Sequence, residues 1–158
     1  MVTSRRDAGT KPPNGWTEST ESGIQVHWYP VTYSNATPFK KRIRAFLKFA
    51  FQSTRKAMSL EGDVVFATST PLTIALPGVF TAWRRRIPMV FEVRDLWPEL
   101  PIAVGALKGR IPIALARWLE RFAYRNATRV VALSQGMKDG VVRIGYHGDH
   151  VHVIPNSA

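Results

Sequence analysis

The chain has 158 residues, 45% of them hydrophobic, with five Trp and eight Phe, which excludes intrinsic disorder and suits one domain with its own core. Twenty-two Lys and Arg against eleven Asp and Glu leave a net charge of +11, which favours anionic partners such as lipid headgroups, nucleic acid or phosphorylated substrates. The sequence has no cysteine and no run of eighteen apolar residues, so it predicts no disulfide, no thiolate metal site and no membrane-spanning helix.

The N-terminal part reads as loop followed by one strand. Residues 1–23 are rich in Pro, Gly, Ser and Thr, which is typical of loops. Only Met1 to Ser4 has the pattern of the end of a strand. Ile24 to Tyr29 alternates apolar and polar side chains, which predicts a half-buried strand at a sheet edge, ended by Pro30. We therefore expect the folded domain to begin at residue 24.

A first helix is predicted over Pro38 to Leu60, with Thr37 as its N-cap. Its expected inward stripe repeats at helical spacing and comprises Phe39, Ile43, Phe46, Leu47, Ala50 and Phe51. The other face is basic, and no acidic residue occurs between Pro38 and Leu60. Positive charge near a helix N-terminus is unfavourable by a few tenths of a kcal/mol per exposed residue, so helix stability does not explain this pattern.

This basic face predicts an anion-binding surface. An acidic leaflet attracts each Lys or Arg near it by roughly 1 kcal/mol, so a few such residues suffice for reversible peripheral attachment to a membrane. The candidate membrane-binding residues are Lys40, Lys41, Arg42, Arg44 and Lys48. A solvated face on an ordinary core helix and a nucleic-acid surface are the alternatives.

Asp63 to Thr68 is an apolar run between turn residues, which predicts a buried strand. The turn after it contains Ser69 and Thr70 and leads into a helix predicted over Pro71 to Arg86. Hydroxyl groups at a helix N-terminus can hold a phosphate or a sugar, and can equally be a routine cap. The expected buried face of this helix is Leu72, Ala75, Leu76, Val79, Phe80 and Trp83.

The most informative stretch is Met89 to Glu99, which reads M-V-F-E-V-R-D-L-W-P-E. Its first five residues predict a strand that is covered on both faces of a parallel sheet. Polar and aromatic residues follow at once, namely Arg94, Asp95, Trp97 and Glu99. Ligands of open α/β sheets bind beyond the carboxyl ends of the strands, so this cluster is a site candidate. A structural ion pair or a helix cap is the alternative.

The remaining pattern alternates helix and strand. A third helix is predicted over Leu107 to Asn126, with an inward face of Ile111, Leu115, Trp118, Leu119 and Phe122 and an outward face of Arg117, Glu120, Arg121 and Arg125. A strand at Arg129 to Leu133, a helix at Gln135 to Ile144 opened by Ser134, and a strand at Val151 to Ile154 follow. This alternation predicts an α/β fold with a doubly wound, mostly parallel sheet. The histidine pairs near the C-terminus lack an acidic partner at metal spacing, so neither a metal nor a cofactor is expected.

Four segments resemble the N-terminal domain of family 4 glycosyltransferases of bacterial capsule, O-antigen and colanic-acid type polysaccharide assembly. They are F-E-V-R-D-L-W-P-E at Phe91 to Glu99, A-R-W-L-E-R-F-A-Y-R-N-A at Ala116 to Ala127, V-V-A-L-S-Q-G-M at Val130 to Met137 and V-I-P-N at Val153 to Asn156. The resemblance covers the chain from Ile24 onward, and R-D-L-W-P-E is its most specific motif. It implies a GT-B architecture, in which one Rossmann-like domain binds the acceptor and a second binds the nucleotide sugar.

The resemblance also implies a domain organisation. Residues 24–155 correspond to the Rossmann-like acceptor-binding half, residues 156–158 to the start of the interdomain linker, and residues 1–23 to the remnant of a truncated strand. The family's first strand and the C-terminal domain that holds most of the nucleotide-sugar donor have no counterpart in this sequence. We therefore expect the chain to be inactive alone and to self-associate or rearrange its sheet, because an unpaired buried strand edge is costly.

The resemblance assigns roles to the residues at the strand ends. Arg94 and Asp95 stand where many family members have a His-Asp pair, and the permanent cation of Arg94 suits a lipid-linked pyrophosphate. Asp95 and Glu99 are the candidate catalytic residues, which would orient sugar hydroxyls or the acceptor. Trp97 would either stack on a sugar or, as we expect, pack under the loop. The candidate substrate-binding residues are Arg94, Ser69, Thr70, Trp97 and Ser134.

The sequence therefore predicts the acceptor-binding domain of a retaining glycosyltransferase that transfers a sugar from a nucleotide sugar to a lipid-linked saccharide. The expected location is the cytoplasm, peripheral on the inner face of the cytoplasmic membrane. The alternative is a non-enzymatic basic α/β module that binds anionic membrane or lipid-linked sugars. Nucleic acid is not an expected partner, because charge alone supports it and no recognisable binding motif is present.

Overall fold

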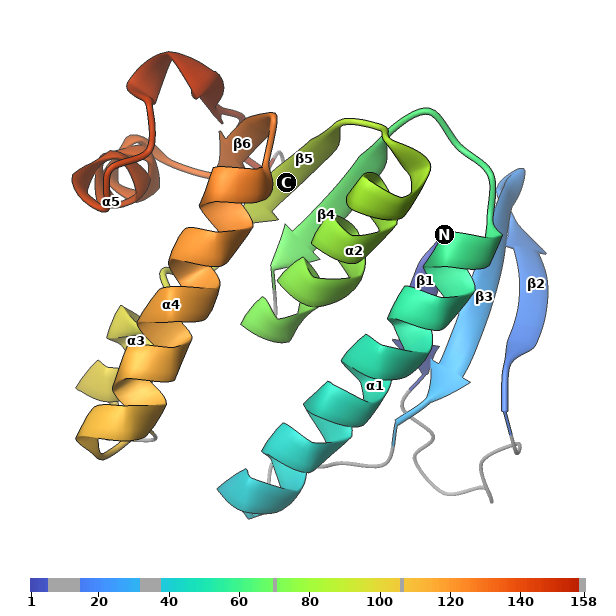
Figure 1. Cartoon of the computed structure of the whole chain (residues 1–158), viewed down its shortest axis with the longest axis horizontal. Helices are drawn as coiled ribbons and strands as arrows, with labels where there is room; N and C mark the ends of the chain where they lie inside the picture. Colours follow the sequence, from blue (N-terminus) through green and yellow to red (C-terminus); the bar gives the residue numbers. More distant parts are fainter. Residues whose placement is uncertain (6–14, 32–37, 70, 106, 157–158) are drawn as a thin grey trace. The chain divides into compact units, whose positions relative to one another are not determined.

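The structure, a computed structural model, describes residues 1–5, 15–31, 38–69, 71–105 and 107–156. The chain forms two compact units, residues 1–60 and residues 61–158 (Figure 1). The expected N-cap Thr37 and the candidate binding residue Thr70 lie outside the described residues. The side chains of Phe39 and Lys40 also lie outside the description.

The first unit contains a three-stranded sheet in the order β1-β3-β2. Its strands are β1 (Val2–Arg5), β2 (Thr17–Glu21) and β3 (Ile24–Pro30). The prediction that Ile24 to Tyr29 is a sheet edge was wrong, because β3 pairs in parallel with β1 and antiparallel with β2. The alternation of apolar and polar side chains indicates which face of a strand is buried, but it does not indicate how many strands pair with it.

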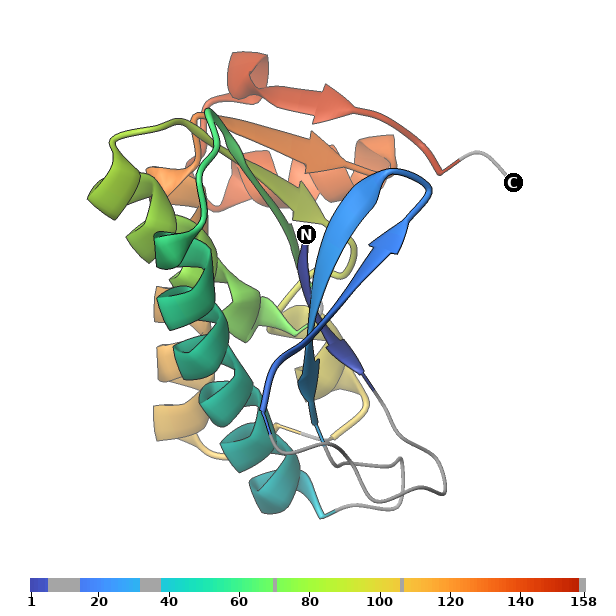
Figure 2. The ribbon, with the colours of Figure 1, turned by 90° about the vertical axis from the view of Figure 1, so that its right-hand side faces the viewer.

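Strand β2 lies inside the segment that was expected to be loop. Its sequence T-E-S-T-E has no apolar residue, so it gives no strand signal. A two-residue turn joins it to β3, and both turn residues, Ser22 and Gly23, have positive φ angles of 50° and 81°. That geometry matches the twist of an antiparallel hairpin, which Figure 2 shows as the blue ribbon pair.

Helix α1 (Phe39–Ser59) packs on β1 and β3. Phe49, Ala50 and Ser53 are its buried residues, and the Ser53 hydroxyl donates to the Phe49 carbonyl at 2.7 Å, which satisfies a buried polar group. The predicted inward stripe was therefore partly wrong, because Leu47 and Phe51 are exposed. The buried residues Phe49, Ala50 and Ser53 share a face that does not include Leu47 or Phe51.

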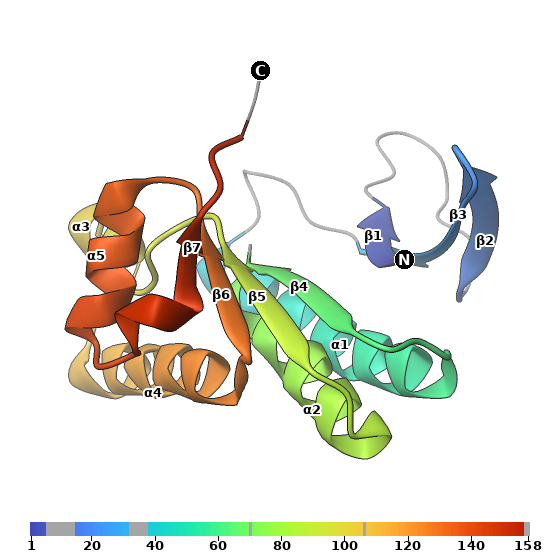
Figure 3. The same ribbon diagram turned by 90° about the horizontal axis from the view of Figure 1, so that it is seen from above.

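The second unit contains four parallel strands in the order β4-β5-β6-β7. They are β4 (Val65–Ser69), β5 (Met89–Val93), β6 (Arg129–Ala132) and β7 (Val151–Val153), and Figure 3 shows them side by side. The predicted α/β class with a parallel sheet is confirmed, and β5 has the predicted bounds. Met89, Phe91 and Val93 of β5 are buried, whereas the residues between them are only partly covered.

Short and long helices connect these strands. They are η1 (Leu72–Ile74), α2 (Ala75–Arg85), α3 (Glu99–Ala103), α4 (Arg110–Asn126), α5 (Gln135–Arg143) and η2 (Gly148–His150). Helices α2 and α4 pack against each other on one face of the sheet (Figure 3). The core lies between them and the strands, where Val79, Phe91, Tyr124 and Val130 are all buried.

The predicted faces of α2 and α4 were only partly wrong, because Ala75 and Val79 are buried and Leu119 packs against the core as predicted. On α4, Glu120, Ala123 and Tyr124 are buried, whereas Leu115 and Trp118 are exposed. On α2 the buried face includes small residues, and Phe80 and Trp83 point to solvent. Close packing selects shape as well as hydrophobicity, so the largest apolar residues of both helices are not their innermost ones.

Gly78 marks the closest approach of α2 to the sheet. A Cβ atom at this position would lie 2.9 Å from the Met89 Sδ and 3.0 Å from the Ala67 Cβ. The Ala67 Cβ is fixed to the backbone of β4, so it cannot yield without moving the strand. Glycine is therefore required here by the distance between helix and sheet.

Gly78→Ala should lower the free energy of unfolding by about 1–2 kcal/mol, because the added methyl group overpacks the core. Urea denaturation followed by circular dichroism measures this change. Gly136→Ala is the matched control, since Gly136 is also helical and a Cβ there meets no atom within 4 Å. We expect the control to be neutral or slightly stabilising. Equal effects of the two substitutions would contradict the close approach at Gly78.

Candidate functional site

The carboxyl ends of three neighbouring strands bring the predicted site residues to one edge of the second sheet. Ser69 pairs with Val93, and Val93 pairs with Ala132. Because all three strands are parallel, Arg94 and Ser134 leave the sheet at the same edge as Ser69. Neighbouring strands lie about 4.8 Å apart, so one small ligand can span these positions.

Ser69 connects the end of β4 to the start of the R-D-L-W-P-E segment. Its side chain is 1% exposed, and its Oγ accepts a hydrogen bond of 2.9 Å from the backbone N–H of Arg94. The Arg94 side chain itself is exposed. Ser69 therefore positions the backbone of the segment, and Arg94 presents its charge at the sheet edge.

The rest of the segment divides into packed and exposed residues. Leu96 and Trp97 pack against the core of the second unit, which agrees with the expected packing of Trp97 under the loop. A Cβ on Gly140 of α5 would lie 3.0 Å from Leu96 Cδ2, so Leu96 also fixes the segment to α5. Asp95 is half-buried, and Glu99 is exposed at the first residue of α3.

Ser134 acts as a helix cap in this structure. It precedes α5, and its Oγ accepts a hydrogen bond of 3.3 Å from the backbone N–H of Met137. This interaction satisfies one of the N–H groups that the first turn of a helix leaves without a partner. The side chain is exposed, so the cap and the N-terminal end of α5 both lie open at the sheet edge.

Glu120 is a buried acid that the sequence reading placed outward. Its side chain is 3% exposed, and its Oε1 accepts a hydrogen bond of 3.3 Å from the Tyr124 hydroxyl. Burial raises the pKa of Glu120 to about 7, the Tyr124 bond opposes the shift, and the negative charge of Glu99 adds to it. Ala116 and Ala123 share this face by helical spacing, and these small residues were the available signal.

The basic residues of α1 differ in their exposure. Lys41, Arg44 and Lys48 are exposed, and together with Tyr29, Pro30 and Val31 they line a hollow of about 520 Å³. Arg42 is partly buried. Lys56 instead donates to Glu18 Oε1 at 2.9 Å, and this bond holds the pKa of Glu18 below its usual value.

No group of three or more His, Asp or Glu that could hold a metal ion occurs in the part of the chain that the structure describes. Among the same residues, no helix is long and apolar enough to cross a bilayer. The described residues at the carboxyl ends of β4, β5 and β6 include the guanidinium group of Arg94, the carboxylates of Asp95 and Glu99, and the hydroxyl group of Ser134. Such groups bind and orient a phosphorylated or hydroxylated ligand.

The raised pKa of Glu120 predicts a pH dependence of stability. Between its ordinary value of 4.5 and about 7 the folded chain holds a proton that the unfolded chain releases, so the free energy of unfolding falls as pH rises through this window. Glu120→Gln keeps the hydrogen bond without titrating. The melting temperature of Glu120→Gln minus that of the unaltered chain should therefore be roughly 3–6 °C larger at about pH 8 than at about pH 5.

Thermal unfolding at a series of pH values measures this difference. Glu61→Gln is the control, because Glu61 is exposed and the substitution removes the same charge. We expect the control to follow the unaltered chain at every pH. A Glu120→Gln curve that also runs parallel to the unaltered chain would show that Glu120 is not protonated in the fold.

Comparisons with known proteins agree with this geometry. Residues 1–157 match the family model described as a glycosyl transferase 4-like domain. Among solved structures, the fold is similar to Anabaena Alr3699/HepE in complex with UDP and glucose, with a TM-score of 0.53 and 18% identity over 86% of this chain. A second crystal structure, of Anabaena Alr3699/HepE in complex with UDP-glucose, gives a TM-score of 0.52 and 16% identity over 86% of this chain. None of the curated proteins matches.

This chain covers 32% and 31% of the two HepE chains, so it spans about a third of their length. At these identities the likeness establishes the fold, and it confirms the expected Rossmann-like α/β domain of the GT-B kind. The family match covers nearly all of the sequence, including the strand ends that carry Ser69, Arg94 and Ser134. The chain belongs to the glycosyl transferase 4-like domain family.

Proposed function

We propose that this chain is the acceptor-binding domain of a retaining glycosyltransferase, which moves a sugar from a nucleotide sugar to a lipid-linked saccharide in cell-surface polysaccharide assembly. The observation that carries the proposal is the bond between Ser69 Oγ and the Arg94 backbone. It fixes R-D-L-W-P-E at the carboxyl edge of a parallel sheet, where ligands of such folds bind. The family match supplies the reaction class.

The exposed charges at this edge suit a pyrophosphate-linked acceptor. Arg94 carries a permanent positive charge and a planar fork of donors, which pairs well with phosphate oxygens. Asp95 and Glu99 orient sugar hydroxyls, since carboxylates accept hydrogen bonds from them. The hydroxyl group of Ser134 adds a further contact. Neither carboxylate needs to act as a base, because the departing phosphate takes that part in the proposed reaction.

The donor is bound mainly by a second domain in this proposal. HepE, whose chain is about three times longer than the part matched here, was crystallised with UDP and UDP-glucose. UDP sugars are therefore the first donors to offer. Because a two-substrate transition state requires both substrate sites, we expect residues 1–158 alone to be inactive.

The exposed cations of α1 support peripheral attachment to the inner face of the cytoplasmic membrane, where lipid-linked acceptors lie. Lys41, Arg44 and Lys48 share one face of the helix around the hollow beside β3. The same observation favours the second candidate function, a non-enzymatic module that binds anionic membrane or lipid-linked sugars. Transfer activity distinguishes the two functions.

The decisive experiment compares residues 1–158 with the same chain extended along its gene in both directions. Each protein is offered labelled UDP, GDP and dTDP sugars with membrane extract as acceptor, and label is followed into the lipid fraction. We expect transfer by the extended protein only. Transfer by residues 1–158 alone would contradict the proposal that a second domain binds the donor. Failure of the extended protein with every donor would favour the non-enzymatic binding module.

In the extended protein, Arg94→Gln should lower kcat/KM for the lipid-linked acceptor about 10- to 100-fold, because a charge-assisted contact to phosphate is lost. The matched control is Arg129→Gln, which removes an exposed arginine from the opposite end of the same sheet. We expect the control to retain full activity. An equal loss in both variants would mean that net charge, and not the position of Arg94, sets acceptor binding.

A further inference from the structure

The outer face of α4 presents two adjacent rows of exposed residues. In the first row Ile111, Leu115 and Trp118 are 75%, 61% and 57% exposed, which is unusual for large apolar side chains so close together. The second row consists of Arg110, Arg117, Arg121 and Arg125, all exposed. Because Glu120, Ala123 and Tyr124 occupy the buried face, both rows point away from the sheet.

Aromatic contacts hold the apolar row in place. Trp118 stacks on Phe122 with ring centroids 5.3 Å apart, and Trp83 of α2 meets Phe122 edge-on at 5.7 Å. The Trp83 Nε1 donates to Asn126 Oδ1 at 3.2 Å, so its ring is anchored although it is 54% exposed. We call this region the α2–α4 surface, and it comprises Trp83, Ile111, Leu115, Trp118 and Phe122 with the four arginines.

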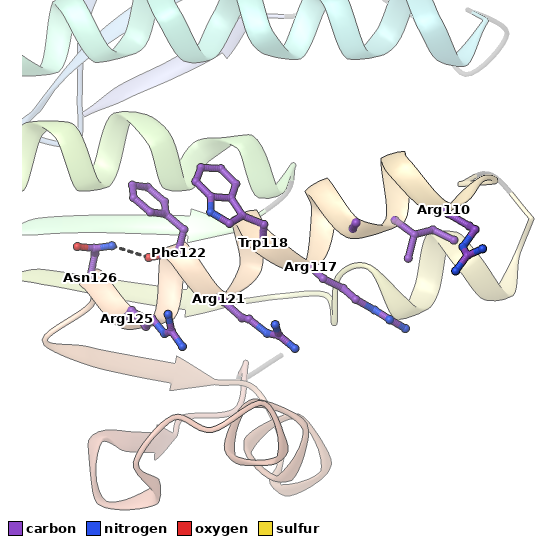
Figure 4. A pocket seen from close by; sticks show the side chains of 9 residues that line it. Arg110, Arg117, Trp118, Arg121, Phe122, Arg125 and Asn126 are labelled. Carbon is purple, nitrogen blue, oxygen red and sulfur yellow. Dashed lines mark hydrogen bonds between the residues drawn. The ribbon is translucent and has the colours of Figure 1, made fainter.

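The α2–α4 surface carries positive charge only. Glu120 is the single acidic residue within α2 and α4, and it is buried on the opposite face of α4. The arginines border a shallow hollow of about 690 Å³ along the helix. Figure 4 shows Trp118 and Phe122 on one flank of α4 and Arg117, Arg121 and Arg125 along the other.

This combination matches the chemistry of an anionic bilayer surface. Tryptophan rings reside at the level of the headgroups, and helices that lie in the interface plane bury an apolar stripe beside arginines or lysines. Arginine stems also extend along apolar surface while the guanidinium group reaches the headgroups. A solvated helix face would explain the arginines and would leave the exposed apolar row unexplained.

We propose that the α2–α4 surface docks on an anionic membrane, with α4 lying parallel to the bilayer plane. The choice of a membrane as the occupant rests on the proposed function, because a lipid-linked acceptor is reached at a bilayer. The arginine row contacts lipid phosphates, and the apolar row enters the boundary between headgroups and acyl chains. All residues of the α2–α4 surface belong to the second unit, whereas the basic face of α1 belongs to the first.

Vesicle co-sedimentation of the 158-residue chain tests the proposal, using phosphatidylcholine vesicles with and without phosphatidylglycerol. The chain should bind only the anionic vesicles, and high salt should weaken binding. The triple variant Arg117→Gln, Arg121→Gln, Arg125→Gln should bind about 100-fold more weakly, at roughly fivefold for each arginine near the surface. The double variant Ile111→Ser, Leu115→Ser should weaken binding at least tenfold without touching the core.

A matched triple variant, Arg129→Gln, Lys138→Gln, Arg143→Gln, removes the same charge from elsewhere in the second unit, and it should bind nearly as well as the unaltered chain. Equal losses in the two triple variants would overturn the proposal, as would an unaltered chain that stays in the supernatant. Analytical ultracentrifugation tests the alternative that a second copy of this chain, and not a membrane, covers the α2–α4 surface. The proposal fails if the serine variant turns a dimer into a monomer while vesicle binding is unchanged.

The vesicle assay contains neither donor nor acceptor, so its outcome is independent of transfer. Vesicle binding by the 158-residue chain, together with failure of the extended protein to transfer sugar from any donor, would contradict the proposed function and would support the membrane surface. Suppose instead that the extended protein transfers sugar to a detergent-dispersed acceptor, whereas the 158-residue chain does not bind vesicles. That result would contradict membrane docking of the α2–α4 surface and would support the proposed transferase function.

Discussion

Parallel pairing of four strands is the constraint on which the rest of the second unit depends. It sets Ser69, Val93 and Ala132 side by side, so every connection must leave the sheet at one edge and return to the other. The returning helices cover one face, and the departing segments bring their polar residues together. The bond from the Arg94 N–H to Ser69 Oγ then turns a shared edge into a defined site.

Helix α4 meets two different requirements on its two faces. Inward it presents small residues and the Glu120–Tyr124 pair to the core, and outward it presents arginines and large apolar residues. Burying Glu120 in its protonated form lowers stability at higher pH, whereas the apolar row exposes surface that folding would ordinarily remove from water. The first feature weakens the domain as pH rises, and the second leaves apolar surface in water until a partner surface covers it.

The sequence was sufficient to predict the parallel strands of the second sheet and the residues that follow their carboxyl ends, but it predicted the faces of the helices only in part. Strand β5 and the Ser134 cap followed from local rules, since both depend on neighbouring residues along the chain. The face that α4 turns inward depends on its packing against α2 and β5, which are distant along the chain. Strand β2 was missed because its polar sequence forms a strand only through pairing with β3.

The central claim is that the carboxyl edge of β4, β5 and β6 holds the pyrophosphate of the acceptor. Nuclear magnetic resonance titration of the labelled chain with a short-chain prenyl pyrophosphate sugar tests this claim most directly. The account predicts saturable shifts of the backbone amides of Arg94, Asp95 and Ser134, with little change at Val65, Met89 and Arg129 on the opposite edge. Shifts confined to the opposite edge, or none at saturating ligand, would contradict it.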